Sequence, residues 1–210
     1  MKDKFQTVLK EPLPKSFYAR DTKLVAINLL GKVLAHQADD GVIKGRIVET
    51  EAYYGPGDPA SHAFRGKTKR SGIMWGKPGT AYVYFTYGMH YLLNVVTEEE
   101  GKAGAVLIRA LEPVQGIEIM RKKRGINNIR ELCNGPAKLT QAFGINGRYN
   151  GVNLTSGKLI IEEGERERFD IISTGRIGIK KGREEDLRFY IRGCEFVSKK
   201  RIKDAKRNKN

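Results

Sequence analysis

Two carboxylates in one extended segment are the first candidates for chemistry. Residues 47–53 read IVETEAY, and side chains alternate across a strand, so every second residue shares a face. One face then carries Ile47, Glu49, Glu51 and Tyr53. A carboxylate on such a face can act as a general base toward water. A simply solvated face is the alternative, so the pair gains meaning only from a partner elsewhere in the chain.

Arg109 is the best candidate for that partner. It lies in AVLIRAL, the most apolar strand-like segment of the chain, which predicts burial on both faces. A buried guanidinium needs a carboxylate to offset its desolvation, and Glu49 and Glu51 are the best-placed acids. Such an arginine also keeps a carboxylate ionised and oriented. A purely structural ion pair remains the alternative.

Aromatic residues crowd the segment 80–94, TAYVYFTYGMHYLLN, which holds four of the nine tyrosines. They are Tyr82, Tyr84, Tyr87 and Tyr91. Tyr87 directly precedes Gly88 at an expected hairpin tip, where an exposed aromatic is a candidate wedge between bases. Tyr53 and Tyr84 offer flat faces on which an extruded base could stack. Packing of each tyrosine on a sheet is the alternative.

Two further polar residues are candidates for base contacts. His62 lies in the loop DPASHAF, and loop positions favour function over packing. Asn94 ends an apolar strand, where its amide could bond within a pocket or fill space in it. A solvated histidine and a satisfied core amide are the alternatives. The three histidines, His36, His62 and His90, form no metal triad, and nucleotide-loop, zinc-protease and serine-hydrolase motifs are absent.

The charge balance favours a polyanionic partner. The chain has 39 Lys and Arg against 24 Asp and Glu, a net charge of +15, which promotes salt-sensitive binding to nucleic acid. A merely basic protein is the alternative. Cys133 and Cys194 have no metal-ligand spacing; a disulfide between them has no support in the sequence, and two small core residues are the alternative. Residues 1–14 lack the apolar core of a signal peptide, and no run of about 18 apolar residues occurs. We expect an intracellular, reducing location, in bacterial cytoplasm or nucleoid or in a eukaryotic nucleus.

The elements that must position these residues are mostly strands. Gly55 to Gly79 is a long loop rich in Gly, Pro and Lys, a length that usually marks a functional segment. Expected strands cover 33–35, 42–54, 81–87, 90–96, 105–111, 159–162, 171–173 and 187–191, with turns at 39–41 and 88–89. Strands in runs and helices in runs, without βαβ alternation, predict an α+β fold that is mostly antiparallel.

Three helices complete the prediction. They run from an Asp21 cap to Gly31, from near Pro113 to Gly125, and from an Asn134 cap, with Pro136 in the first turn, to Gly144. No linker divides the chain, so we expect one domain over 1–210, with an N-terminal arm over 1–16, in a stretch that extends to Arg20, and a basic tail over 199–210. The tail is either a solvated end or an added contact to phosphate.

Five stretches taken together carry a family resemblance. They are IVETEAYYGPGDPASH, KPGTAYVYFTYGMHYLLN, VLIRALEP, ELCNGPAKL and LRFYIRG. From about Phe17 to Lys199 the chain resembles the alkyladenine (3-methyladenine) DNA glycosylases of mammals and many bacteria. The resemblance implies a single α+β domain with a curved, mostly antiparallel sheet, flanking helices and a projecting hairpin. It also implies hydrolysis with water as the nucleophile. The reaction then forms no covalent lysine intermediate, does not cleave the DNA strand, and needs no metal or organic cofactor.

The resemblance also implies roles for individual residues. Glu51 matches the general base, and Arg109 matches the residue that holds the water and the carboxylate. The groups that sandwich a flipped base correspond to Tyr53, His62 and Tyr84. Tyr87 matches the wedge that fills the gap in the duplex, and Asn94 matches the side chain that clashes with the 2-amino group of guanine.

The sequence therefore predicts an enzyme that flips damaged purines from duplex DNA and hydrolyses the glycosidic bond, leaving an abasic site. 3-Methyladenine, 7-methylguanine and hypoxanthine are the candidate substrates. The loop between His62 and Trp75, and His90 in place of an aromatic, depart from the mammalian pattern and leave the lesion range open. We expect a monomer and no membrane partner. A non-catalytic binder of damaged DNA and a nucleoside hydrolase are the alternative functions.

Overall fold

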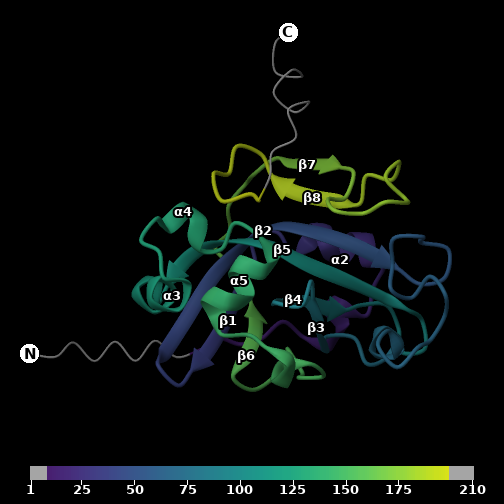
Figure 1. The fold of residues 1–210 in the computed structure, drawn as a ribbon, viewed down its shortest axis with the longest axis horizontal. Helices are drawn as coiled ribbons and strands as arrows, with labels where there is room; N and C mark the ends of the chain where they lie inside the picture. The colour runs from purple at the N-terminus through teal and green to yellow at the C-terminus, as the bar shows by residue number, and fades with distance from the viewer. Residues whose placement is uncertain (1–8, 199–210) are drawn as a thin grey trace, which may run out of the picture.

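The computed structural model describes residues 9–198, which build an α+β domain around one antiparallel sheet (Figure 1). The strands are β1 (Val33–Ala38), β2 (Gly41–Tyr54), β3 (Ala81–Thr86), β4 (His90–Val96), β5 (Gly104–Gln115), β6 (Leu159–Glu162), β7 (Ile171–Thr174) and β8 (Arg188–Ile191). Their main order is β3-β4-β5-β2-β1-β6, with β8 beside β2 and β7 beside β8. The sheet curls so that β7 and β8 lie above β2 in the view of Figure 1. The predicted fold class is confirmed.

Short helices flank the sheet and close its core. They are α1 (Lys15–Tyr18), α2 (Thr22–Asn28), α3 (Ile117–Arg124), α4 (Ile129–Leu132) and α5 (Pro136–Phe143), with 3-10 turns η1 (Gly72–Trp75) and η2 (Gly147–Tyr149). α2 and α5 contribute Val25, Ala26, Leu139 and Phe143 to the main apolar cluster. Asp21 accepts a hydrogen bond from the Leu24 N–H and so caps α2 as predicted. No helix among the described residues is long and apolar enough to cross a membrane.

The pairing of β2 with β5 contains irregularities that determine which residues face the site. Val48 is skipped between Ile47 and Glu49, and Arg109 is skipped where Thr50 pairs with Ile108. Such β-bulges re-aim side chains. Ile47 and Val48 both join the apolar core, so the polar face begins at Glu49 rather than at Ile47 as alternation alone predicts.

The β3–β4 hairpin ends in a tight turn that displays Tyr87. The Met89 N–H donates to the Thr86 carbonyl at 3.2 Å, and the central residues Tyr87 and Gly88 have φ of 50° and 67°. Two positive φ values define the type I′ turn that suits a two-residue hairpin. β3 therefore ends one residue earlier than predicted. Tyr87 is 84% exposed, and its backbone has a positive φ that non-glycine residues seldom adopt.

Two helix starts differ from prediction. Pro113 does not begin a helix, because β5 continues to Gln115 and α3 starts after Gly116. Gly116 has φ 73°, and a Cβ there would lie 2.6 Å from the Val42 carbonyl, so only glycine fits this strand-to-helix turn.

The second difference concerns α5, whose cap is Gly135 instead of the expected Asn134. The Asn134 side chain instead accepts a hydrogen bond from Lys138 Nζ at 2.7 Å. Pro136 occupies the first turn of α5 as predicted, and the helix ends at Gly144. Helix α4 was not predicted, because a four-residue helix has too little periodicity to detect.

The N-terminal stretch packs on the domain over its described part. Pro12 bridges to Glu162, the terminal residue of β6, and Leu13 and Tyr18 are buried in the main core. Residues 9–20 therefore do not project as a free arm. The basic tail predicted over 199–210 lies outside the described residues.

Candidate active site

One row of paired residues crosses five strands and brings distant parts of the chain together. Its members are Tyr82, Asn94, Leu107, Glu51 and Arg188, on β3, β4, β5, β2 and β8. Directly paired residues in a sheet point to the same face. The register thus places an aromatic, an amide, a carboxylate and a guanidinium on one face, in that order across the sheet.

A cavity of about 720 Å³ opens over this face, a volume typical of a site for a small organic group. It is lined by six of the seven predicted site residues: Tyr53, His62, Tyr84, Tyr87, Asn94 and Arg109. The seventh, Glu51, is fully buried immediately behind the cavity wall. The structure therefore brings the predicted site residues together from four strands, a loop and a hairpin tip.

Glu49 is held by two guanidinium groups. Its carboxylate accepts from Arg109 Nε at 2.9 Å and from Arg188 Nε at 2.7 Å. The Ser198 N–H donates to it at 2.7 Å. Burial raises the pKa of Glu49, but the charges of Arg109 and Arg188 outweigh it and lower the pKa overall. Glu49 is therefore an ionised anchor that fixes Arg109.

Glu51 has a different environment, with two hydrogen bonds and one ion pair. The Ile177 N–H donates to Oε1 at 2.7 Å, the Tyr53 hydroxyl donates to Oε2 at 2.7 Å, and Arg109 Nη1 lies 3.2 Å from Oε2. Burial raises the pKa of Glu51 although Arg109, Ile177 and Tyr53 act against it. A higher pKa makes a stronger proton acceptor. The two carboxylates thus divide into an anchor and a base.

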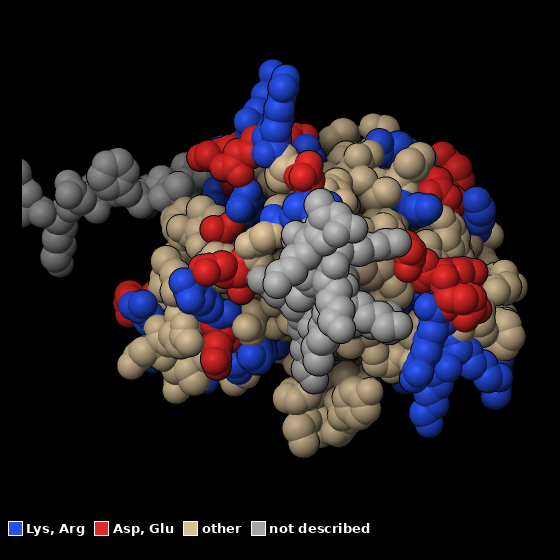
Figure 2. Space-filling model, turned by 90° about the horizontal axis from the view of Figure 1, so that it is seen from above, with Lys and Arg blue, Asp and Glu red and all other residues tan. Residues whose placement is uncertain are grey.

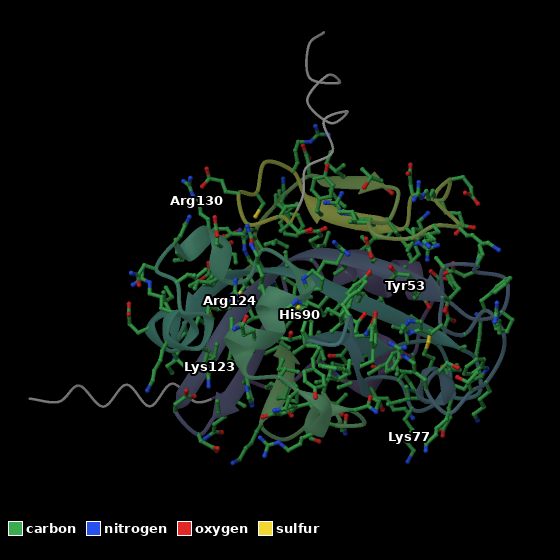
Figure 3. The ribbon with its side chains drawn as sticks, in the orientation of Figure 1. Tyr53, Lys77, His90, Lys123, Arg124 and Arg130 are labelled. Atoms are coloured by element: carbon green, nitrogen blue, oxygen red, sulfur yellow. The ribbon has the colours of Figure 1, made fainter. Side chains whose placement is uncertain are left out.

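Tyr53 forms one wall of the cavity and is backed by a buried ion pair. The Arg176 guanidinium carbon lies 4.7 Å from the centroid of the Tyr53 ring. Arg176 Nη1 and Nη2 donate to the Asp58 carboxylate at 2.6 and 2.8 Å, and both residues are buried. In the view of Figure 3, Tyr53 lies below β8, on the opposite side of the molecule from Arg130 near α4. This wall is thus fixed from behind.

The opposite wall consists of three aromatic rings. The ring centroids of His62 and Tyr84 lie 4.7 Å apart, and those of Tyr82 and Tyr84 lie 5.2 Å apart. His62 Nδ1 and the Tyr82 hydroxyl share a hydrogen bond of 2.8 Å. Burial, followed by the charge of Arg70, lowers the pKa of His62 to about 4. His62 is therefore neutral near pH 7, so none of the three rings of this wall carries a charge.

Asn94 lies on the floor between the walls. It is buried, and its Nδ2 donates to the Tyr82 carbonyl at 3.0 Å. That bond fixes the plane of the amide on the cavity surface. The side chain is therefore both a satisfied amide, as in the simpler reading of the sequence, and part of the cavity lining.

Basic side chains surround the mouth. Arg65, Lys180 and Lys181 line it from two different loops. In Figure 2 the upper face carries separate basic and acidic groups rather than one continuous basic field, and basic side chains project at its edges. Within residues 9–198, no cluster of three or more His, Cys, Asp or Glu suits a metal ion.

Several residues of the site were not found by sequence reasoning. Arg188 interrupts the apolar stretch LRFYIRG, so the burial argument applied to Arg109 would have found it. Ile177 contributes only its backbone N–H, which no side-chain pattern reveals. Asp58 and Arg176 are 118 residues apart, and nothing in either local sequence predicts that they pair.

The fold and the site define a class before any comparison is made. A buried carboxylate, facing aromatic walls and a basic rim are expected of a nucleic-acid enzyme that acts on one extruded base. The model of the family "Methylpurine-DNA glycosylase" matches residues 16–195. The chain belongs to the methylpurine-DNA glycosylase family, which confirms the resemblance seen in the sequence and supports DNA glycosylase activity toward alkylated bases.

Relatives from several microorganisms match almost end to end. A protein of Carboxydothermus hydrogenoformans is 54% identical over 190 residues, which are 90% of this chain and 99% of the relative. One of Chlorobium phaeobacteroides strain BS1 is 47% identical, over 93% and 99% of the two chains. One of Methanoculleus marisnigri is also 47% identical, over 90% and 99%. Each is named "Putative 3-methyladenine DNA glycosylase".

Proposed function

We propose that this protein is a monofunctional DNA glycosylase that flips alkylated or deaminated purines out of duplex DNA and hydrolyses their glycosidic bond with an activated water. Family membership supports the reaction class, and the names of the relatives point to 3-methyladenine. 7-Methylguanine and hypoxanthine are further substrates in this proposal. An abasic site is the product, and no metal or organic cofactor takes part.

The environment of Glu51 carries the proposal. Cleavage of the bond between a purine nitrogen and C1′ builds oxocarbenium character on the sugar. A carboxylate beside C1′ stabilises that charge and removes a proton from the incoming water. Glu51 combines burial with a raised pKa. Tyr53, Arg109 and Ile177, which hold it, all line the cavity, so water entering between them meets the carboxylate.

The two aromatic walls select the base. Tyr53 stacks on one face of the flipped purine, and Tyr84 with His62 covers the other. A base alkylated at N3 or N7 carries a positive charge, which gains roughly 1–2 kcal/mol from such rings. A neutral lesion such as hypoxanthine must be protonated as it leaves. Asn94 on the floor rejects guanine by a clash with its 2-amino group.

The hairpin tip and the basic rim bind the duplex. Tyr87, exposed on its strained turn, inserts into the stack and fills the gap that the flipped base leaves. Arg65, Lys180 and Lys181 at the mouth contact phosphates, which makes the affinity salt-dependent. One wedge and one pocket suffice for this task, so we propose that the protein acts as a monomer.

Base release tests the proposal. Two labelled duplexes, one with hypoxanthine and one randomly methylated, are incubated with wild type, Glu51→Gln and Glu100→Gln, and hot alkali then converts abasic sites to breaks. Wild type and the control at exposed Glu100 should produce abasic sites without nicking. Glu51→Gln should bind normally and lose about 10²–10⁴-fold in rate.

Three outcomes would contradict the proposal in different ways. If neither wild type nor the control releases a base while both bind, the protein is a non-catalytic binder of damaged DNA. If Glu51→Gln releases bases at the wild-type rate, the reaction stands but the assignment of the general base is wrong. Nicking without alkali would contradict the monofunctional reaction.

A further inference from the structure

Each aromatic wall of the cavity has an arginine behind it. The Arg176 guanidinium carbon lies 4.7 Å from the Tyr53 centroid, and that of Arg70 lies 4.7 Å from the Tyr84 centroid. Both tyrosines line the cavity, whereas neither arginine does. The guanidinium groups therefore stack on the ring faces turned away from the space that a flipped base would fill.

The two arginines differ in their net charge. Arg176 is buried, and its bidentate pair with Asp58 makes a neutral unit. Arg70 is exposed, and its guanidinium donates to the Phe85 carbonyl, a neutral acceptor, at 3.4 Å. Among residues 9–198 no carboxylate pairs with it. The Tyr84 wall therefore carries an uncompensated positive charge, and the Tyr53 wall does not.

The charge of Arg70 acts on the groups that line the cavity. It lowers the pKa of His62 in addition to burial, and it opposes the rise in the pKa of Tyr82 that burial causes. The segment that carries Arg70 is held in place by Thr68 and Ser71. Their hydroxyls accept from each other's N–H at 3.1 and 3.0 Å. Arg70 is thus positioned to influence the pocket.

We propose that Arg70 is a specificity-determining residue that weakens the binding of positively charged bases between the walls relative to neutral ones. The inference rests on the proposed function and specifies its substrate class. A cationic base stacked on Tyr84 would lie roughly 8 Å from the guanidinium, one ring and one stacking distance away. Repulsion at that distance, partly screened at the surface, amounts to about fivefold in affinity. It offsets part of the cation–π attraction, while a neutral base is unaffected.

The test is a ratio of affinities measured before any chemistry occurs. Two duplexes of the same flanking sequence carry 7-methylguanine, which is cationic, or hypoxanthine, which is neutral, each on a 2′-fluoro sugar. The fluorine disfavours the oxocarbenium ion and so protects the bond. Dissociation constants are measured for wild type, Arg70→Gln, Arg70→Lys and Lys69→Gln, and base release from the unprotected duplexes by wild type is measured in parallel. Lys69 is the neighbouring exposed cation.

Arg70→Gln should shift the ratio of the two dissociation constants about fivefold in favour of the cationic lesion. Arg70→Lys, which keeps the charge, should remain near wild type. Lys69→Gln should weaken both complexes equally, because it removes only attraction to phosphate. An unchanged ratio in Arg70→Gln, or equal weakening of both complexes, overturns the inference even though wild type releases bases. If wild type releases neither base from the unprotected duplexes, the proposed function itself fails.

Discussion

The two walls of the cavity are made of the same kind of residue but are built in opposite ways. Tyr53 lies on β2 in the middle of the sheet, and buried Arg176 and Asp58 support its ring. Tyr84 lies on β3 at the sheet edge, beside His62 from the long loop, and exposed Arg70 supports its ring. One wall is fixed by a neutral, buried network, and the other is open to solvent and positively charged.

The difference suggests a division of labour between the walls. The general base must keep its position relative to the sugar to within a fraction of an ångström. Glu51 is held on the fixed side by a hydrogen bond from Tyr53 and an ion pair with Arg109. Damaged purines differ in shape and charge. The residues that select among them can therefore be substituted more freely if they do not contact the general base Glu51. Among residues 9–198, His62 and Arg70 on the opposite side form no hydrogen bond or ion pair with Glu51, Tyr53 or Arg109.

The largest effect that this comparison predicts is a loss of protein stability when the support behind Tyr53 is removed. Asp58→Asn leaves the Arg176 guanidinium buried without its charged partner, which should lower the free energy of unfolding by about 3–5 kcal/mol. Arg70→Gln, at the exposed site behind the other wall, should change it by no more than about 0.5 kcal/mol. Urea unfolding of both variants measures the difference. Equal effects would show that the walls are not built differently.

The pH dependence of base release tests the division between the carboxylates. A general base works only when deprotonated, so the single-turnover rate on 7-methylguanine should fall about tenfold per pH unit below the pKa of Glu51. Burial raises this pKa, so the inflection should lie above the ordinary value of about 4.3 for glutamate. Circular dichroism at each pH shows whether the protein stays folded.

A different pH profile would contradict the role of Glu51 as general base. If the rate stays constant down to the ordinary glutamate pKa, Glu51 is not the group that titrates. Glu49 cannot replace it as the titrating group, because Arg109 and Arg188 lower the pKa of Glu49.

The sequence predicted the fixed wall better than the open one. Strand alternation placed Glu49, Glu51 and Tyr53 on one face, and the apolar flanks of Arg109 predicted its burial. These signals are local and periodic, so a single segment contains them. The bulges at Val48 and Arg109 were not predictable, since they depend on the register between strands that are far apart in the sequence.

The open wall depends on contacts that no local pattern encodes. His62 and Tyr84 were found separately, and the resemblance alone brought them together. Arg70 was not singled out from the sequence, because its stacking on Tyr84 becomes visible only in three dimensions. Sequence reasoning therefore identified the rings of both walls but neither of the cations behind them.

Substitution of Asn94 on the cavity floor tests whether discrimination against guanine is independent of the two aromatic walls. Asn94→Ser shortens the side chain and should relax the rejection of guanine, raising the release of undamaged guanine relative to hypoxanthine by about tenfold. The loss of the bond to the Tyr82 carbonyl affects the pocket for both bases, so the ratio isolates discrimination. Unchanged discrimination would leave the walls as the sole selectors.

The smallest expected change in affinity and stability comes from substitutions of Tyr87 at the tip of the β3–β4 hairpin, the hairpin that also contains Tyr84. Tyr87 has φ 50°, a conformation that costs about 1 kcal/mol for a residue with a Cβ and little for glycine. Tyr87→Gly and Tyr87→Ala both remove the wedge, so both should weaken binding to a lesion duplex by a few-fold, about 1 kcal/mol. Only Tyr87→Gly removes the strain, so it should unfold at a higher urea concentration than Tyr87→Ala. If affinity instead follows stability between the two variants, the tip acts by holding the hairpin's shape, and the exposed ring is not what fills the duplex.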